Sequence, residues 1–233
     1  MKRAMRHDSL DNASMENELI RLRGIRFAFD GREALFEDLH FSLCRGDRLA
    51  LTGGTGAGKT TLLRMIMGFV RPDEGELRLF GRDCRSEKDF AAARARLGFM
   101  FQDADDQLFC PTVAEDVAFG PLNLGLPREI VHERVHAALD EVGLAGFEQR
   151  VSYRLSGGEK KLAALATVLA MKPEALLLDE PTAGLPEETA ERIARILRAS
   201  GLPCLIISHD RAFLEQSAVR VLRLHAGRIA LAK

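Results

Sequence analysis

The sequence has no apolar run long enough to cross a bilayer. Its longest candidate, residues 162–171, spans ten positions and includes a threonine, whereas a membrane-spanning helix needs about 20 predominantly apolar residues. We therefore expect any association with a membrane to be peripheral. The first residues are partly basic but no apolar segment follows them, so we expect a disordered lead over residues 1–17 and no secretory signal.

The sequence also has no large excess of positive or negative charge. Lys and Arg number 33 against 34 Asp and Glu, and the formal net charge is -1. Because non-specific nucleic-acid binders depend on a basic field, nucleic acid is not expected as a partner. The four cysteines are scattered without C-x-x-C spacing, which favours reduced thiols in a cytosolic protein over a zinc site or a disulfide framework.

The apolar pattern predicts one α/β domain with a helical insert. A chain of 233 residues that is 46% hydrophobic can bury a large core. The predicted strands are residues 19–29, 36–43, 49–51, 75–80, 97–101, 175–179, 203–208, 219–224 and 228–231. The predicted helices are residues 86–96, 113–119, 128–142, 158–171 and 186–199. The first two strands form an antiparallel opening, and alternation of strands with helices elsewhere predicts a mainly parallel core sheet.

A glycine-rich loop separates an apolar run at residues 49–51 from a helical pattern that follows it. The loop satisfies G-x-x-x-x-G-K-[ST], the phosphate-loop pattern, with the strand before it and the helix after it that this motif requires. Glycines here can turn successive N–H groups inward to hold an anion, so an ordinary βα turn is the less favoured interpretation. Lys59 would reach the β and γ phosphates, and the Thr60 hydroxyl would bind Mg²⁺. The candidate nucleotide-binding residues are Gly53, Gly54, Thr55, Gly56, Ala57, Gly58, Lys59, Thr60 and Thr61.

A second acidic motif ends the buried strand predicted at residues 175–179. Four apolar residues run into Asp179 and Glu180, a pattern typical of the acidic half of a nucleotide hydrolase. Asp179 would hold Mg²⁺ through water, while Glu180 would orient and deprotonate the attacking water. A lone Asp-Glu pair would more simply be a solvated strand end, but the phosphate loop favours the catalytic interpretation.

The sequence LSGGE at residues 155–159 precedes a long apolar helix. Ser156, Gly157 and Gly158 would present a hydroxyl and bare N–H groups to an anion, although Ser-Gly-Gly alone is equally a plain helix cap.

In this order, the motifs resemble those of the ATP-binding cassette (ABC) ATPases over about residues 18–233. The resemblance implies a P-loop NTPase fold, with a nucleotide-binding core at residues 18–102 and 173–233 and a helical subdomain at residues 103–172. It also implies that ATP and Mg²⁺ are the cofactors and that Phe29 stacks on adenine. The implied catalytic residues are Glu180, His209, Lys59 and Gln102, and the implied metal-binding residues are Thr60, Gln102 and Asp179.

The same resemblance implies an assembly. Two such domains would sandwich two ATP molecules head to tail, so Ser156, Gly157 and Gly158 of one subunit would complete the Lys59 site of another. Residues 101–126 resemble the corresponding stretch of energy-coupling-factor importer ATPases, particularly the cobalt and nickel branch. This implies a peripheral subunit on the cytoplasmic face of the membrane that powers import of a transition-metal ion or vitamin through separate membrane subunits.

Two other functions remain open at this stage. A soluble ABC ATPase could act as a clamp on DNA or ribosomes, although such clamps generally have two cassettes, a coiled-coil insert or basic arms. A nucleotide-binding regulator without turnover is disfavoured by the presence of Glu180 and His209.

Residues 105–119 combine acidic and apolar side chains downstream of Gln102. We expect this segment to dock a helix of a membrane subunit. The acidic candidates are Asp105, Asp106, Glu115 and Asp116, and the apolar candidates are Leu108, Phe109, Val117 and Phe119. The two phenylalanines fit an insert core equally well.

Two positions depart from the family pattern. Glu159 replaces the commoner glutamine and keeps a polar residue at the helix start. Pro186 stands where the family usually has an aspartate, so proline removes a carboxylate and an N–H from the loop after Glu180. Cross-talk between two ATP sites is in doubt for that reason.

Overall fold

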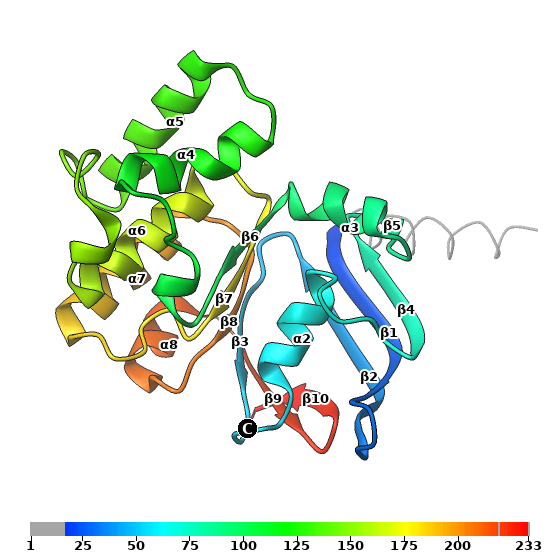
Figure 1. Cartoon of the computed structure of the whole chain (residues 1–233). Helices are drawn as coiled ribbons and strands as arrows, with labels where there is room; N and C mark the ends of the chain where they lie inside the picture. Colours follow the sequence, from blue (N-terminus) through cyan, green and yellow to red (C-terminus); the bar gives the residue numbers. More distant parts are fainter. Residues whose placement is uncertain (1–16, 219, 233) are drawn as a thin grey trace, which may run out of the picture.

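The computed structural model describes residues 17–218 and 220–232. Nearly all of the expected disordered lead at residues 1–17 lies outside the described residues, as does residue 219, the first position of one expected strand. Strands in the described part of the chain form a four-stranded sheet and a six-stranded sheet. Figure 1 shows helix α2 (Lys59–Ile66) between the two sheets, and the helices between residues 113 and 217, α4 to α8, gathered on the far side of the larger sheet.

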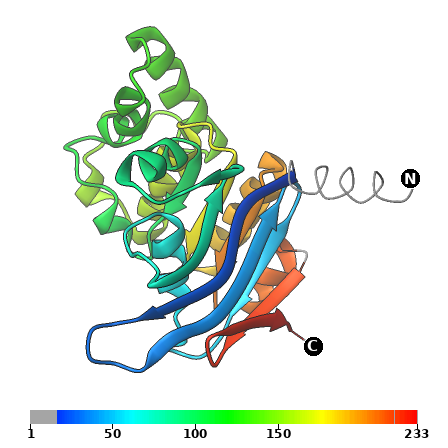
Figure 2. The same cartoon turned by 90° about the vertical axis from the view of Figure 1, so that its right-hand side faces the viewer.

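The four-stranded sheet is antiparallel, in the order β2-β1-β4-β5. Its strands are β1 (Glu18–Ala28), β2 (Ala34–Cys44), β4 (Glu74–Leu79) and β5 (Arg82–Asp83). Both long strands largely alternate buried and exposed side chains, so one face packs on the core while the other meets solvent. They run side by side along one flank of the molecule (Figure 2), which confirms the antiparallel opening. The short β5 was not expected.

The six-stranded sheet has the order β10-β9-β3-β8-β7-β6. Its strands are β3 (Arg48–Thr52), β6 (Leu97–Met100), β7 (Ala175–Asp179), β8 (Cys204–Ile207), β9 (Arg220–His225) and β10 (Arg228–Leu231). Every pair is parallel except β9 with β10. All residues of β7 and β8 are buried, as expected for central strands covered on both faces. The predicted α/β class with a mainly parallel core sheet is confirmed.

The helices cover the two faces of this sheet. They are α2 (Lys59–Ile66), α3 (Glu87–Arg94), α4 (Val113–Asn123), α5 (Arg128–Glu141), α6 (Gly157–Leu169), α7 (Glu187–Ser200) and α8 (Arg211–Ser217), with short 3-10 turns at Ala104–Asp106 and Ser152–Arg154. Successive residues of β7 face opposite sides: Leu177 packs with α2 and the small sheet, and Leu178 packs with α6 and α7. In the described part of the chain, no helix is both long and apolar enough to cross a membrane.

Helix α8 was not predicted. Its seven residues are too few to show a periodic pattern, but Asp210 precedes it and accepts a hydrogen bond from Phe213 N at 3.1 Å. This is the capping chemistry that starts a helix.

The acidic segment at residues 105–119 differs from the expectation. Asp116 is only 3% exposed, and it accepts hydrogen bonds from Phe109 N (2.9 Å), Cys110 N (2.8 Å) and the Ser152 hydroxyl (2.5 Å). Its carboxylate therefore fixes the loop before α4, and the expectation of a docking role for Asp116 is wrong. Leu108 and Val117, also proposed for docking, are buried as well. By contrast, Asp105, Asp106, Glu115, Phe109 and Phe119 are exposed.

Candidate functional site

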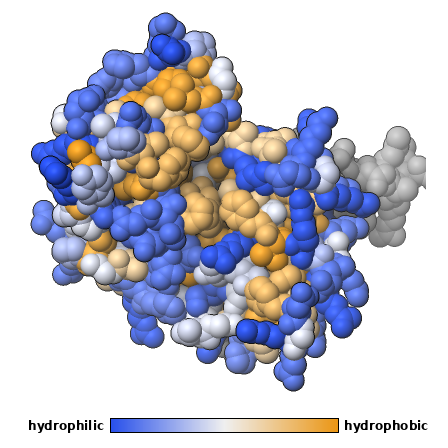
Figure 3. Space-filling view, in the orientation of Figure 1, coloured by the Kyte–Doolittle hydropathy of each residue, from blue (hydrophilic) through white to orange (hydrophobic). Residues whose placement is uncertain are grey.

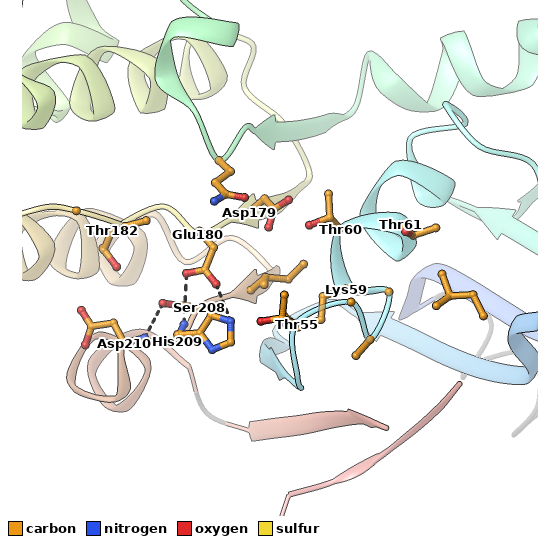
Figure 4. A pocket seen from close by; sticks show the side chains of 18 of the residues that line it. Thr55, Lys59, Thr60, Thr61, Asp179, Glu180, Thr182, Ser208, His209 and Asp210 are labelled. Atoms are coloured by element: carbon orange, nitrogen blue, oxygen red, sulfur yellow. Dashed lines mark hydrogen bonds and ion pairs between the residues drawn. The ribbon is translucent and has the colours of Figure 1, made fainter. Parts of the chain in front are cut away.

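A cleft of about 880 Å³ opens at the carboxyl ends of β7 and β8, against the loop that follows β3. Figure 4 shows side chains from these segments pointing into a common space. The sequence-predicted residues that line it are Phe29, Thr55, Gly56, Ala57, Gly58, Lys59, Thr60, Thr61, Gln102, Asp179, Glu180 and His209. Gly53 and Gly54 belong to the same loop but line a neighbouring groove. Ser156, Gly157 and Gly158 do not line the cleft.

Two glycines of the phosphate loop are required by close packing. A Cβ at Gly53 would lie 2.5 Å from the main-chain oxygen of Leu224. At Gly58 the φ angle is +100°, and a Cβ would lie 2.8 Å from the ring of Phe36. Any side chain at either position would therefore displace the loop, and the loop path depends on glycine at both.

Lys59 opens helix α2 and turns back into its own loop. The ammonium donates hydrogen bonds to Gly53 O at 2.8 Å and Gly54 O at 3.1 Å, and the residue is only 8% exposed. Its charge is thus held at the place where the loop would surround an anion. An ammonium group binds phosphate oxygens as a point charge, so Lys59 is suited to this role.

Asp179 ends β7 beside the Thr60 hydroxyl (Figure 4). Burial raises the pKa of its carboxyl, whereas the hydrogen bond with Thr60 and the charge of Arg64 act to lower it. One carboxylate oxygen, Oδ1, is buried without a hydrogen-bond partner. Because an unpaired buried carboxylate oxygen is costly, this atom is suited to a bound cation.

The described residues contain no cluster of three or more His, Cys, Asp or Glu side chains able to hold a metal. A site built from one hydroxyl and one carboxylate fits Mg²⁺, which keeps several waters and takes further ligands from phosphates. Thr60 and Asp179 therefore fit this ion. Gln102 is exposed and lines both the cleft and an adjoining pocket that contains them.

Glu180 follows Asp179 in a left-handed backbone conformation, with φ at +46°. Its carboxylate accepts a hydrogen bond from His209 N at 3.3 Å, and the His209 ring nitrogen Nε2 lies 3.5 Å from Glu180 Oε1. The side chain of His209 is 63% exposed and that of Glu180 is 14% exposed. The Glu180 carboxylate and the His209 imidazole therefore lie beside each other in the wall of the cleft.

Phe29 lies at the rim of the cleft and is 45% exposed. Its ring contacts Phe27 edge to face, with centroids 4.9 Å apart. The ring is therefore supported by Phe27 and still partly open to solvent, which is compatible with the expected contact with adenine.

The LSGGE residues form the start of α6, away from the cleft. The Ser156 hydroxyl accepts a hydrogen bond from Glu159 N at 3.3 Å, and the Glu159 carboxylate accepts one from Ser156 N at 2.8 Å. The two bonds form a capping box. The bond to Ser156 lowers the pKa of Glu159, and Arg150 lies 3.4 Å from its carboxylate. The negative charge that distinguishes Glu159 from glutamine therefore interacts with the start of its own helix and with Arg150.

Pro186 precedes helix α7 without any side-chain cap. Glu187 and Glu188 stand in the first turn of that helix, where carboxylates interact favourably with the helix dipole. These charges support the helix start where the family aspartate is missing, but they do not replace its position in the loop.

Several lining residues were not predicted from the sequence. Thr182 and Ser208 are buried, and Thr182 Oγ1 has no hydrogen-bond partner. Both stand within two positions of a predicted site residue, so adjacency to Glu180 and His209 was the available signal. The remaining cleft residues are Arg32, Glu33, Leu35, Ala183, Gly184, Leu185, Ile207 and Asp210.

Comparison with known proteins gives concordant matches. The ABC transporter family model matches residues 36–183. The chain is 46% identical over 216 residues to the energy-coupling factor transporter ATP-binding protein EcfA of Methanothermobacter thermautotrophicus, covering 91% of this chain and 69% of that protein. It is 45% identical over 209 residues to an uncharacterized ABC transporter ATP-binding protein of Haemophilus influenzae, covering 90% and 96%.

A solved structure is also similar. It is cbiO1 of Clostridium perfringens, described as part of the ABC transporter complex cbiONQ, with a TM-score of 0.84 and 31% identity. The likeness covers 93% of this chain and 88% of that one.

The position of Lys59 yields a first prediction. Lys59→Ala removes the cation from the loop, so nucleotide-dependent phosphate release should fall by more than about 100-fold, the scale of losing one charge-stabilising donor. Phosphate release is measured with ATP and Mg²⁺. The control is Lys88→Ala, which removes an exposed cation from α3 and should leave the rate unchanged. Equal rates for the two variants would rule out Lys59 as the phosphate-binding cation.

Proposed function

Because the chain belongs to the ABC transporter family and is an ATPase of that family, we propose that it powers import through separate membrane subunits by hydrolysing ATP in the cleft around Lys59. One observation carries the catalytic part of this proposal. The parallel sheet brings Lys59, Asp179 and Glu180 to one cleft, although they are far apart in the sequence. A phosphate-binding cation, a metal ligand and a base are the parts that phosphoryl transfer to water needs.

The roles follow from the positions of the side chains. Lys59 binds the β and γ phosphates at the N-terminus of α2, where the main-chain N–H groups of the loop also attract anions. Glu180 accepts the proton of the water that attacks the γ phosphorus, and the bond to the ADP oxygen breaks. His209, within 3.5 Å of that carboxylate, orients Glu180 and contacts the γ phosphate.

Thr60 and Asp179 would hold Mg²⁺, with Gln102 reaching the same place from β6. When bound, the ion neutralises charge on the phosphates. The buried oxygen Asp179 Oδ1, which has no protein partner, supports this assignment. Phe29 supplies the surface for adenine.

The active form in this proposal is a head-to-tail dimer, of two copies or of one copy and a close paralogue. Ser156, Gly157 and Gly158 lie outside the cleft of their own chain, so they can reach a nucleotide only in another subunit. One feature favours such a contact. A Cβ at Gly157 would meet no atom within 4 Å, so the main chain at this helix start is open to an approaching ligand.

The partner proposed on the other side is a membrane subunit. In this view the chain lies on the cytoplasmic face of the membrane, and residues 103–172 act as the helical subdomain that meets the partner. Relatives named as energy-coupling factor and cbiONQ components support this kind of transporter. On the same basis, we propose that the imported solute is cobalt, nickel or a vitamin.

The docking face would lie next to Gln102. Phe109 and Phe119 stack edge to face with centroids 4.8 Å apart while remaining 62% and 46% exposed. Figure 3 shows apolar side chains gathered on this side of the molecule, between the helical layer and α3. Exposed aromatic pairs beside an acidic residue, Asp106, suit a basic amphipathic helix of the membrane subunit.

The catalytic part is tested with Glu180→Gln. The amide keeps the shape of the side chain but cannot take a proton from water, so kcat should fall by at least about 100-fold while ATP binding is retained. Binding is measured with a fluorescent nucleotide and turnover by phosphate release. A turnover rate equal to wild type would exclude Glu180 as the base.

The dimer is tested with Gly157→Ala. Alanine is a better helix former than glycine by about 1 kcal/mol, and it meets no atom of its own chain, so thermal stability should hold or rise. ATPase activity should nevertheless be lost. Gel filtration of Glu180→Gln with ATP should show a dimer, and adding Gly157→Ala should abolish it. A dimer that persists in the double variant would contradict the head-to-tail arrangement.

The docking face is tested with Asp106→Lys combined with Phe109→Ser. Both side chains are exposed, so ATP affinity should stay near wild type while membrane retention and uptake of labelled cobalt, nickel or vitamin decrease. Glu76→Lys, an exposed charge reversal on β4, is the control and should behave like wild type. Wild-type retention and uptake in the double variant would exclude docking through this face.

A further inference from the structure

Lys161 is a buried cation with no place in the ATP cleft. It lies in α6, close after the LSGGE residues, and is 6% exposed. It lines the adjoining pocket of about 420 Å³, which also contains Thr60, Gln102 and Asp179. Burial lowers its pKa, and the carboxylates of Asp103, Asp179 and Glu180 oppose that shift. A lysine this deep in a protein requires partners for its donors.

Its partners are main-chain oxygens of two catalytic segments. The ammonium donates to Gln102 O at 2.5 Å and to Glu180 O at 3.3 Å. The first oxygen follows β6 and the second follows β7. A single side chain from α6 therefore connects the segment that carries Gln102 with the segment that carries the catalytic base.

The contact with Glu180 falls on a strained backbone. Glu180 has a φ of +46°, a conformation that costs a side-chain-bearing residue about 1 kcal/mol or more and persists only where surrounding contacts enforce it. Glu180 N donates to Ile207 O at 2.9 Å, and Glu180 O accepts from Ala183 N at 3.2 Å as well as from Lys161. Lys161 supplies the charged member of this set, and charge-assisted bonds are the stronger ones.

Other bonds fix α6 to the Gln102 segment, so Lys161 does not act on a loose helix. Gln107 accepts from Phe101 N at 3.1 Å, and its amide nitrogen donates to Ala164 O at 2.9 Å and Thr167 Oγ1 at 2.7 Å. These bonds hold the helix and the segment after β6 as one unit. Within that unit, Lys161 is the side chain that reaches Glu180.

We propose that Lys161 is a positioning residue for hydrolysis: it holds the main chain of Glu180 in its left-handed conformation and in register with Gln102, so that the carboxylate faces the attacking water. Lys161 makes no contact with the nucleotide. The inference rests on the proposed role of Glu180 as the base.

The test begins with Lys161→Met, which keeps the length of the side chain and removes its donors. We expect kcat to fall about 10-fold or more, with the Kd for MgATP within about twofold of wild type, because a positioning residue acts on the transition state and not on ground-state binding. Lys161→Arg, which keeps donors for both oxygens, should retain more activity than Lys161→Met. Lys160→Met is the matched control, because Lys160 is the neighbouring lysine in α6 and its ammonium pairs at 2.6 Å with the exposed Asp105 carboxylate instead of with the main chain of the catalytic segments.

Thermal unfolding separates positioning from folding. Lys161→Met leaves the main-chain oxygens of Gln102 and Glu180 with one partner fewer, so its unfolding temperature should fall. The rates are therefore compared at a temperature where circular dichroism shows both proteins to be folded. If Lys161→Met does not fold, Lys161→Gln, which is shorter and lacks the charge but keeps an N–H donor, takes its place, and its kcat should lie below that of Lys161→Arg.

A double-variant cycle then asks whether Lys161 acts through Glu180. In the Glu180→Gln background, Lys161→Met should lower the residual rate by less than about twofold, since residues that act as one unit are not additive. A full additional loss in that background, or a wild-type kcat for Lys161→Met alone, would overturn the proposal. If Glu180→Gln itself turns over normally, the proposed base fails instead, so the two failures are distinguishable.

Discussion

The cleft depends on the register of three neighbouring parallel strands, β3, β8 and β7. Main-chain pairing sets Leu51 level with Ile207, and Ile207 level with Asp179. The segments that follow these three residues in the chain therefore lie at the same edge of the sheet. The phosphate loop, Ser208 and Glu180 are therefore neighbours because of the strand register, and the chemistry of the cleft follows from hydrogen bonds that involve none of its side chains.

The same burial that fixes the strands places charges where water is scarce. Lys59, Lys161 and Asp179 are all less than a tenth exposed. The ammonium groups of the two lysines donate hydrogen bonds to main-chain oxygens, whereas one carboxylate oxygen of Asp179 has no hydrogen-bond partner. Because buried charges in a low-dielectric setting interact strongly, this arrangement supports the proposed binding of a phosphate group together with a cation.

Sequence reasoning reached the parts whose chemistry is local. The glycines before Lys59 and the carboxylates after the apolar strand at residues 175–179 occupy fixed offsets from a strand end, so their convergence could be predicted. Helices at residues 86–96 and 186–199 were also expected and match α3 and α7 within about two residues, the usual uncertainty of helix ends.

The missed features depend on contacts between distant segments. Asp116 reads as an exposed acidic residue on an amphipathic helix, yet it lies under the turn at Phe109 and bonds Ser152, 36 positions away. Lys161 reads as one of two adjacent surface lysines. Only the packing of α6 against β6 and β7 directs one inward and leaves the other with Asp105. No period or motif in the sequence distinguishes the two.

The two bonds of Lys161 also bear on how such a chain can diverge. Their acceptors are backbone oxygens, which every amino acid possesses, so substitutions at positions 102 and 180 that preserve the main-chain path keep both bonds. A substitution that removes the carboxylate at position 180, and with it the proposed base, can therefore leave the bridge between α6 and the sheet in place. The bridge depends on the main-chain path, whereas the proposed catalysis depends on one side chain.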